Sequence, residues 1–480
     1  MMVLDSKPLF PLMFSLILLY LSISNGRVHC YGEKKAFSLQ RLQWNQPSGH
    51  ALSCLSGKSR RENGATILEM KHRDYCSGKI VDWSKKLQKR LILDNFHVQL
   101  LQSRKGNMAF GAEVAMKARM PLTSGINLHT LNYIVTIELG GRNMTVIVDT
   151  GSDLTWVQCQ PCKSCYNQKE SLFNPSASHS YQSVLCNTSA CRSLHYGSWN
   201  SPLCGTKQPI CNYVVNYGDG SYTRGELARE HLSLGKTPVK DFLFGCGRDN
   251  KGLFGGASGI MGLGRSTLSV ISQSSALFGG VFSYCLPSTE AGASGSLVMG
   301  GDSSLFKNFT PFSYTKMVPN PQLSNFYFLN LTGISVGGVA VQAPSFAKGG
   351  VLIDSGTIIT RLAPSVYKAV KAEFLKQFSG FPPAPGFSIL DTCFNLGGYE
   401  EVDIPTLELH FEGNAKLNVD VTGMFYLVKT DASQVCLALA SLSNEDEIGI
   451  VGNYQQKNQR IIYDTKQSKL GFAGETCRFR

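Results

Sequence analysis

The chain has 480 residues, 43% of them hydrophobic, which is enough to bury the cores of two lobes and argues against a small binding module. Its formal net charge of +12 would suit a nucleic-acid-binding protein if the charge were spread along the chain. It is concentrated instead: residues 27–120 hold 18 Lys and Arg against 7 Asp and Glu, whereas residues 121–480 hold 27 against 26.

The N-terminal segment predicts export. Lys7 precedes an apolar run over residues 9–21 and the small residues Ser24 and Gly26, a pattern typical of a signal peptide at residues 1–26. The run is too short to span a membrane. No second long apolar stretch follows, and the polar residues 475–480 do not resemble the signal for a lipid anchor. We expect a soluble product that does not bind membranes.

The basic segment over residues 27–120, here called the leader, has three interpretations. Its cations could pair with active-site carboxylates in an inhibitory prosegment, it could be a solvated and partly helical leader, or it could bind phosphates through counterion release. The first two fit better because the leader lacks a nucleic-acid-reading motif. A prosegment would be removed near residues 119–124.

The cysteine count predicts an oxidising compartment. Of 15 cysteines, three (Cys30, Cys54 and Cys76) lie in the leader and twelve follow it, an even number that suits six disulfides. Spacing alone does not define their connectivity. Four Asn-x-Ser/Thr sequons are compatible with glycosylation in that compartment: Asn143, Asn187, Asn308 and Asn330.

Beyond residue 120 the sequence pattern predicts a mainly β structure. Short β-branched and aromatic runs alternate with glycine, for example over residues 133–139, 213–217 and 461–463. The clearest helical pattern covers residues 364–378, where proline can occupy the first turn.

An internal repeat organises this part of the chain. An apolar strand ends in Asp149-Thr-Gly-Ser152, and a second ends in Asp354-Ser-Gly-Thr357. Each is followed by a hydrophobic-hydrophobic-Gly motif, which ends at Gly262 in the first copy and at Gly452 in the second. Two copies in the same order predict two homologous β lobes that face each other across a cleft.

Such an arrangement suits acid–base chemistry. The glycine of each turn, Gly151 or Gly356, permits close approach of the facing lobe, so two carboxylates can meet. Like charges at that distance share one proton, which leaves one member as base and the other as acid. The base can activate a water and the acid can protonate a carbonyl oxygen. The pair titrates as a unit, so the sequence assigns neither role to one residue.

Residues 149–162 closely resemble the first active-site segment of plant nepenthesin-type, pepsin-like aspartic proteases, a group that includes chloroplast-nucleoid DNA-binding members. The resemblance covers roughly residues 130–480. It implies a bilobal pepsin-like fold, with an N-terminal lobe at residues 121–320 and a C-terminal lobe at 321–480. It also implies an endopeptidase made as a zymogen, with Asp149 and Asp354 as catalytic residues.

The resemblance assigns further roles. Residues 217–221 match the flap that closes over substrate, with Tyr217 as the flap tyrosine, Gly218 beside it, and Trp156 as the hydrogen-bonding partner of Tyr217. Ser152 and Thr357 match the hydroxyls that bond the catalytic carboxylates. Gly262 and Gly452 match the glycines beneath the two aspartates.

The resemblance also implies a cysteine-rich insertion over residues 159–211 and a set of disulfides. The implied pairs are Cys159–Cys162, Cys165–Cys246, Cys186–Cys211, Cys191–Cys204, Cys285–Cys477 and Cys393–Cys436. The spacing of Cys159, Cys162 and Cys165 also resembles a metal or iron–sulfur ligand set, but secretion and the missing further ligands favour disulfides. We expect no metal and no cofactor.

Three functions remain open: an active endopeptidase, a binding or inhibitory protein on the same fold, and a nucleic-acid-binding protein. A protease of this family would act on extended polypeptides at acidic pH, prefer hydrophobic residues beside the cut, bind pepstatin-type inhibitors and work as a monomer. Nucleic acid is not an expected partner once the leader is removed, because the rest of the chain is nearly neutral. We expect the protein outside the cell, in the apoplast; the vacuole and the plastid are the alternatives.

Overall fold

The computed structural model describes residues 32–39, 57–73, 82–106, 133–205, 209–217, 220–252, 254–288, 294–301, 305, 311–346 and 348–479. The following features predicted from the sequence lie outside the described residues: the signal peptide at residues 1–26, the cleavage region at 119–124, the sequon at Asn308, the flap glycine Gly218, and the leader cysteines Cys30, Cys54 and Cys76. Among the described helices, none is long and apolar enough to cross a membrane.

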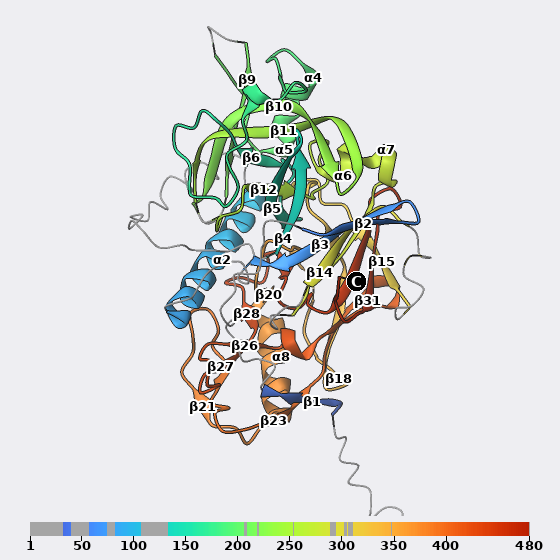
Figure 1. Ribbon diagram of the computed structural model, residues 1–480. Coiled ribbons are helices and arrows are strands. Elements are labelled where there is room, and N and C mark those ends of the chain that lie inside the picture. Colours follow the sequence, from blue (N-terminus) through green and yellow to red (C-terminus); the bar gives the residue numbers. More distant parts are fainter. Residues whose placement is uncertain are drawn as a thin grey trace, which may run out of the picture.

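The fold is mainly β, as predicted (Figure 1). Its helices are α2 (Trp83–Gly106), α4 (Ser189–Arg192), α5 (Leu194–Gly197), α6 (Val270–Gln273), α7 (Ser275–Phe278) and α8 (Pro364–Gln377). The strands before residue 302 are β1 (Lys34–Ser38), β2 (Ser59–Glu62), β3 (Ala65–His72), β4 (Tyr133–Leu139), β5 (Arg142–Asp149), β6 (Trp156–Gln158), β7 (Gln182–Ser183), β8 (Leu203–Cys204), β9 (Cys211–Asn216), β10 (Tyr222–Leu234), β11 (Thr237–Lys251), β12 (Gly259–Gly262), β13 (Val281–Cys285) and β14 (Ser294–Met299). The strands after residue 310 are β15 (Ser313–Val318), β16 (Phe328–Leu329), β17 (Leu331–Val336), β18 (Val339–Ala340), β19 (Val351–Ile353), β20 (Thr360–Leu362), β21 (Pro383–Ala384), β22 (Cys393–Phe394), β23 (Glu401–Pro405), β24 (Leu407–Phe411), β25 (Ala415–Val419), β26 (Phe425–Leu427), β27 (Val435–Leu437), β28 (Leu439–Ser441), β29 (Gly449–Val451), β30 (Gln459–Asp464) and β31 (Lys469–Gly474).

A central sheet joins the two halves of the chain. Strand β14 pairs with β13, β13 pairs with β30, and β30 continues through β31 to β15, so strands from both halves share one hydrogen-bonded surface. The apolar cluster on this surface includes Phe282, Tyr284 and Tyr463, all fully buried. The two halves are therefore joined by a continuous sheet and a continuous core.

The described part of the leader is folded against the rest of the molecule. Strand β3 lies between β14 and β4 in the central sheet, and nearly all its residues are buried. Strand β1 pairs antiparallel with β23 in the second half of the chain. These strands do not fit the solvated leader that was one alternative from the sequence.

Each half repeats one arrangement of strands around its Asp-x-Gly turn. In the first half β5 lies parallel to β12, which places Gly262 opposite Asp149. In the second half β19 lies parallel to β29 in the same way. The internal repeat of the sequence is thus also a repeat of parallel strand pairs, each ending at an aspartate.

Helix α2 of the leader lies between the two halves (Figure 1). Leu87 and Leu91 pack against one buried cluster of the second half, while Val98 and Leu101 pack against another. Their spacing of four, seven and three residues puts all four on one helical face. This apolar stripe packs the helix against the second half, and Asp82 caps its N-terminus by accepting a bond from Lys85 N at 3.0 Å.

Candidate active site

Two turns of the repeat hold their carboxylates in the same way. They are Asp149–Ser152, here called the first turn, and Asp354–Thr357, here called the second turn. The backbone N–H of Gly151 donates to Asp149 Oδ1 at 2.9 Å, and that of Gly356 donates to Asp354 Oδ1 at 2.9 Å. Both aspartates are buried, with 3% and 0% of their surface exposed. Each turn therefore holds its carboxylate with its own backbone, so the side-chain direction is built into the local fold.

The first turn lies directly against the second. A Cβ added to Gly151 would lie 2.8 Å from Asp354 Oδ1 and 3.3 Å from Asp149 Oδ1. Only glycine leaves room for both carboxylates at this point. The structure thus brings together the two aspartates that the sequence repeat singled out.

Two residues to which the sequence analysis gave no role hold the turns together. Ser355 N donates to Thr150 Oγ1 at 2.9 Å, and Thr150 N donates to Ser355 Oγ at 3.1 Å. These reciprocal bonds are buried and join equivalent positions of the repeat. The signal was present, since both residues carry a hydroxyl between the aspartate and the glycine of each turn, but their contact is a tertiary one.

The hydroxyls expected on the carboxylates behave differently in the two turns. Thr357 Oγ1 donates to Asp354 Oδ2 at 2.6 Å, as the resemblance implied. The buried Ser152 hydroxyl lowers the pKa of Asp149, but it forms no well-aligned hydrogen bond among the described residues. The predicted bond from Ser152 to Asp149 is therefore not formed in this state.

The two carboxyls have opposite electrostatic settings. Burial raises the pKa of Asp149 to about 6, and the negative charge of Asp354 adds to the rise. Burial would also raise the pKa of Asp354, but the hydrogen bond and charge of His97 and the hydrogen bond from Thr357 hold it below its usual value. The pair is thus set up with a proton on Asp149 and a charge on Asp354.

His97, on leader helix α2, contacts the second aspartate directly. Its Nε2 lies 3.2 Å from Asp354 Oδ2. Burial lowers the pKa of His97, but the hydrogen bond and charge of Asp354, with smaller effects from Asp149 and Asp94, raise it overall. The imidazolium and the carboxylate form an ion pair that occupies one face of the site.

A second ion pair holds the same helix one turn earlier. Asp94 Oδ2 accepts a bond from Arg361 Nη2 at 2.8 Å, and Asp94 Oδ1 accepts from Ile358 N at 2.5 Å. Ile359 N also donates to Asp94 Oδ2, at 3.3 Å. Asp94, His97 and Arg361 were not predicted from the sequence. A signal existed, because Asp94 interrupts the apolar face of an otherwise basic helix.

The end of α2 reaches the first half of the chain. The Arg104 guanidinium lies 5.4 Å from the ring centroid of Trp199, within cation–π range. Burial lowers the pKa of Arg104 to about 10, against the raising effect of the charges of Asp153 and Asp149. Asp153 is itself buried, which raises its pKa to about 7, and it accepts a bond from Ser266 N at 2.7 Å.

The predicted flap contact is present. Trp156 Nε1 donates to Tyr217 OH at 2.7 Å, and the two rings pack around Phe254. Tyr217 follows β9 and precedes β10, so it stands at the end of a long hairpin. The structure therefore ties Tyr217, at the end of this hairpin, to the buried Trp156 of β6, which follows the first turn.

Four of the six implied disulfide pairs are wrong. The structure pairs Cys159–Cys246 and Cys162–Cys165, where Cys159–Cys162 and Cys165–Cys246 were expected. The reason is strand register, because β6 runs parallel to β11 with Val157 opposite Cys246. Cys159 and Cys246 are thereby buried side by side, and the loop after β6 closes on itself.

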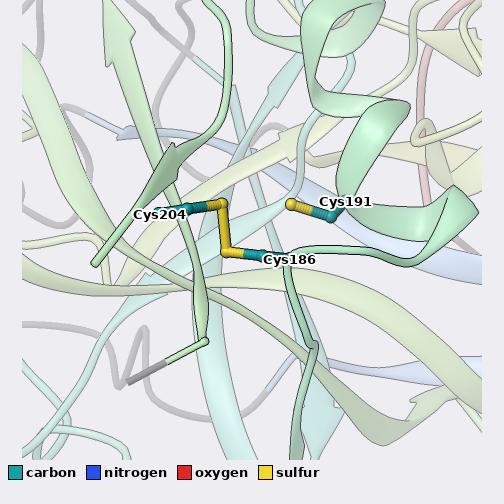
Figure 2. Close-up of side chains that lie close together, drawn as sticks. All are labelled: Cys186, Cys191 and Cys204. Carbon is teal, nitrogen blue, oxygen red and sulfur yellow. A yellow bond between two sulfur atoms is a disulfide. The ribbon is translucent and has the colours of Figure 1, made fainter. Parts of the chain in front are cut away.

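The nested pairs of the insertion are also corrected. The structure has Cys186–Cys204 and Cys191–Cys211, where Cys186–Cys211 and Cys191–Cys204 were expected. Burial separates them, since Cys191 and Cys211 are fully buried and Cys204 is exposed. Figure 2 shows the Cys191 sulfur beside the Cys186–Cys204 bond, and these three sulfurs lie within 4.8 Å of one another. Such proximity explains why spacing could not separate the pairings.

The remaining predicted pairs, Cys285–Cys477 and Cys393–Cys436, are present. All three cysteines of the run Cys159, Cys162 and Cys165 are in disulfides and offer no thiolate to a metal.

Three of the sequon asparagines, Asn143, Asn187 and Asn330, are exposed.

Two family models match the chain. The model described as Xylanase inhibitor N-terminal covers residues 133–301, and the one described as Xylanase inhibitor C-terminal covers residues 326–474. The boundary between them falls between the two turns described above.

Plant proteases are among the similar sequences. The Aspartyl protease family protein At5g10770 of Arabidopsis thaliana is 43% identical over 365 residues, which is 75% of each chain. Aspartic proteinase nepenthesin-1 of Nepenthes gracilis is 34% identical over 359 residues, 72% of this chain and 78% of that one.

Solved structures share the fold. The crystal structure of edgp superposes with a TM-score of 0.57 at 22% identity, over 73% of this chain and 93% of that one. Basic 7S globulin from soybean superposes with a TM-score of 0.56 at 20% identity, over 71% and 91%. At these identities the likeness supports the two-domain pepsin-like fold alone.

Proposed function

Because the chain belongs to the nepenthesin-like family of plant aspartyl proteases, we propose that it is a secreted aspartic endopeptidase synthesised as an inactive precursor. The observation that carries the proposal is the pair of adjoining turns, in which Asp149 and Asp354 are buried together with pKa values shifted in opposite directions. Adjoining buried carboxyls share one proton; in the precursor burial and the charge of Asp354 raise the pKa of Asp149, and His97 adds to the split by holding the pKa of Asp354 low.

The reaction follows from this geometry. With α2 removed, the ionised carboxylate takes a proton from a water, whose oxygen attacks the scissile carbonyl carbon, while the protonated carboxyl donates to the carbonyl oxygen. The tetrahedral intermediate collapses when the carboxyl that took the water proton gives it to the amide nitrogen, the C–N bond breaks, and the other carboxylate takes back a hydroxyl proton as the new carbonyl forms. The paired backbone N–H groups of Gly151 and Gly356 keep both carboxylates aimed throughout.

The leader would block this reaction in the precursor. His97 contacts Oδ2 of Asp354, and Asp94 accepts a bond from Ile358 N directly after the second turn. The leucines of α2 pack against the apolar residues beside it. A substrate chain cannot use the same atoms while the helix is bound. Activation would then require α2 to leave, followed by cleavage within the stretch between α2 and β4.

We further propose that the protein reaches the apoplast through the secretory pathway. The six disulfides and the exposed sequon asparagines suit an oxidising route. N-terminal sequencing of the protein from culture medium and from cells tests both steps. A start near residues 119–124 on the active form is expected, whereas an active form that begins at Tyr31 or earlier would contradict the precursor.

The central experiment measures cleavage of a denatured protein between pH 2 and pH 7. Unaltered protein, pepstatin-treated protein and the Asp149→Ala variant are compared after acid treatment. Pepstatin-sensitive cleavage that the substitution abolishes is the expected result. A folded, leader-free protein that cleaves nothing would instead favour a binding protein on the same fold, the alternative that the xylanase-inhibitor description raises.

A further inference from the structure

The carboxylate of Asp94 lies in an anion site that belongs to the enzyme portion of the chain. Asp94 is the only acidic residue of α2, and 1% of its surface is exposed. Its oxygens accept bonds from Arg361 Nη2 and from the backbone N–H groups of Ile358 and Ile359, at 2.8, 2.5 and 3.3 Å. One guanidinium and two adjacent N–H groups around a carboxylate make a strong, charge-assisted set.

These donors lie beside the catalytic pair. Ile358 directly follows Thr357, whose hydroxyl bonds Asp354 Oδ2 at 2.6 Å. Strand β20 carries Arg361 and pairs with β28 and β29, so the guanidinium is attached to the sheet beneath the second turn. Ile358 and Ile359 also belong to the buried cluster that Leu87 and Leu91 cover. An anion in this site is thus one residue away from the catalytic turn, with apolar groups beside it.

The repeat supports a role in recognition. Arg361 lies seven residues after Asp354, and the residue seven after Asp149 is Trp156. The neighbouring threonines match as well, because Thr155 Oγ1 accepts from Gly262 N and Thr360 Oγ1 accepts from Gly452 N. In the first half this position holds the flap tyrosine through Trp156. In the second half the same position presents a cation instead.

We infer that Arg361, with the N–H groups of Ile358 and Ile359, forms a subsite that selects an acidic side chain of the substrate once α2 has left. The inference rests on the proposed protease activity and names its substrate class. With the helix gone, Arg361 keeps its bond to Ile359 O at 3.1 Å, but the groups that held Asp94 lack their anion. A buried cation and two aimed donors favour a carboxylate over a neutral amide of the same shape.

The test is a scan of peptides with the leader-free enzyme. A single cleavable parent peptide, apolar on both sides of the cut, carries Glu or Gln in turn at each of the four positions on either side. We expect one position at which kcat/KM for the Glu peptide exceeds that for the Gln peptide by about 10-fold or more. Since the pKa of Glu is about 4.3, this ratio should be present at pH 5.5 and fall toward 1 at pH 3.

Variants then assign the preference to Arg361. Arg361→Gln should bring the Glu/Gln ratio to about 1 and Arg361→Lys should retain part of it, whatever their absolute rates. Arg192→Gln is the matched control, because Arg192 is exposed on α4 and bonds only locally to Asn187 O; its ratio should equal that of the unaltered enzyme.

The outcomes separate the two proposals. If no peptide of the scan is cut, the protease proposal fails. If the Gln peptides are cut and no position favours Glu, the subsite alone is overturned, and this result comes from unaltered enzyme and does not depend on the folding of a variant. A Glu preference that Arg361→Gln leaves intact would also overturn it.

Discussion

The two catalytic turns have nearly the same backbone and quite different surroundings. Each carboxylate accepts a bond from its own glycine N–H, and each turn follows a strand with a parallel neighbour, which ends at Gly262 in the first half and just before Gly452 in the second. Yet the second turn is bonded directly by Asp94 and His97 of α2, whereas on the first side the described leader contributes Arg104, whose guanidinium lies over the ring of Trp199.

The difference shows where symmetry ends in this molecule. The repeat supplies two equivalent carboxylates, and the leader makes them unequal by placing its imidazolium on Asp354. The residues seven positions after the two aspartates, here called the position-seven residues, also differ between the halves. Trp156 bonds Tyr217 of the hairpin in the first half, and Arg361 binds the carboxylate of Asp94 in the second. Substitutions at equivalent positions therefore test which effects are shared and which belong to one side.

The largest expected effect comes from the carboxylates themselves, where the halves should be equal. Asp149→Asn or Asp354→Asn removes one member of the acid–base pair, and each should reduce kcat of the leader-free enzyme by at least about 10³-fold. Steady-state cleavage of a fluorogenic peptide measures this, with thermal unfolding as a control for the fold. If a variant keeps a tenth of the activity, the aspartate that it lacks is not a member of the acid–base pair.

Asp94→Ala should loosen the leader on the second side. It leaves Arg361 buried without its anion, and breaking a buried ion pair costs about 3–5 kcal/mol. Hydrogen exchange of α2 in the full-length precursor should accelerate accordingly. Asp82→Ala is the matched control on the same helix, where loss of an exposed capping contact to Lys85 N costs about 1 kcal/mol. Equal effects of the two would argue against the ion pair as the main attachment.

The contact between His97 and Asp354 predicts a pH window for the covered state. The pKa of His97 is raised by folding, so its contribution is complete below the ordinary value of 6.5 and is lost as pH rises through the raised value. The pKa of Asp354 is lowered, so its contribution is complete above 3.8 and is lost as pH falls through the lowered value. The contribution of this ion pair to helix docking should be strongest between pH 3.8 and 6.5.

Binding of a pepstatin-type inhibitor measures this window, since the inhibitor needs the uncovered site. The ratio of its affinity for the precursor to that for the leader-free enzyme, followed from pH 2 to pH 8, should be lowest inside the window. His97→Gln should raise that ratio about 10-fold there, because a hydrogen bond between charged groups contributes about 1.5–3 kcal/mol. A ratio that His97→Gln leaves unchanged at pH 5 would contradict the role of the ion pair.

The bonds between the turns should matter equally from either side. Thr150→Val removes the acceptor of Ser355 N, Ser355→Ala removes the acceptor of Thr150 N, and each should reduce the free energy of unfolding by about 1–3 kcal/mol. Urea unfolding of the precursor provides the measurement. The double variant should cost less than the sum of the two single ones, because either substitution alone already removes the bond from Thr150 Oγ1 to Ser355 Oγ; strict additivity would mean that this shared bond contributes nothing.

The smallest expected effect belongs to the first side alone. Trp156→Phe keeps the ring in its cluster but removes the bond to Tyr217 OH, at a cost of about 1 kcal/mol. In the leader-free enzyme this should lower kcat/KM for peptides about 5-fold and leave the Glu/Gln preference unchanged. If that preference moved as well, the two position-seven residues would not act independently.

Several features could be predicted from the sequence because their cause is local. The two Asp-x-Gly turns, the strand at residues 133–139 and the helix at 364–377 follow from short patterns, and all appear in the structure. The Trp156–Tyr217 contact and the disulfides Cys285–Cys477 and Cys393–Cys436 came from a resemblance whose motifs were intact.

Other features depended on register and packing, which short patterns do not contain. Cys159 bonds Cys246 because β6 aligns with β11, and Cys191 bonds Cys211 because both sulfurs face the interior. The basic charge of the leader predicted that its cations contact the active site. It gave no indication that one acidic residue, Asp94, forms an ion pair with Arg361. Net charge is a property of the whole leader, whereas the docking of α2 depends on the few residues that lie on one face of the helix.

The sequence by itself therefore determined the mainly β class, the repeated halves and the identity of the two carboxylates. These follow from residue order within a few positions, where backbone sterics and the freedom of glycine act directly. The tertiary structure alone decided the contact between Thr150 and Ser355, the pairing of the insertion cysteines and the placement of Asp94 and His97 on the second turn. The Thr150–Ser355 contact depends on the packing of one half against the other, the insertion disulfides depend on local burial, and the placement of Asp94 and His97 depends on the docking of α2.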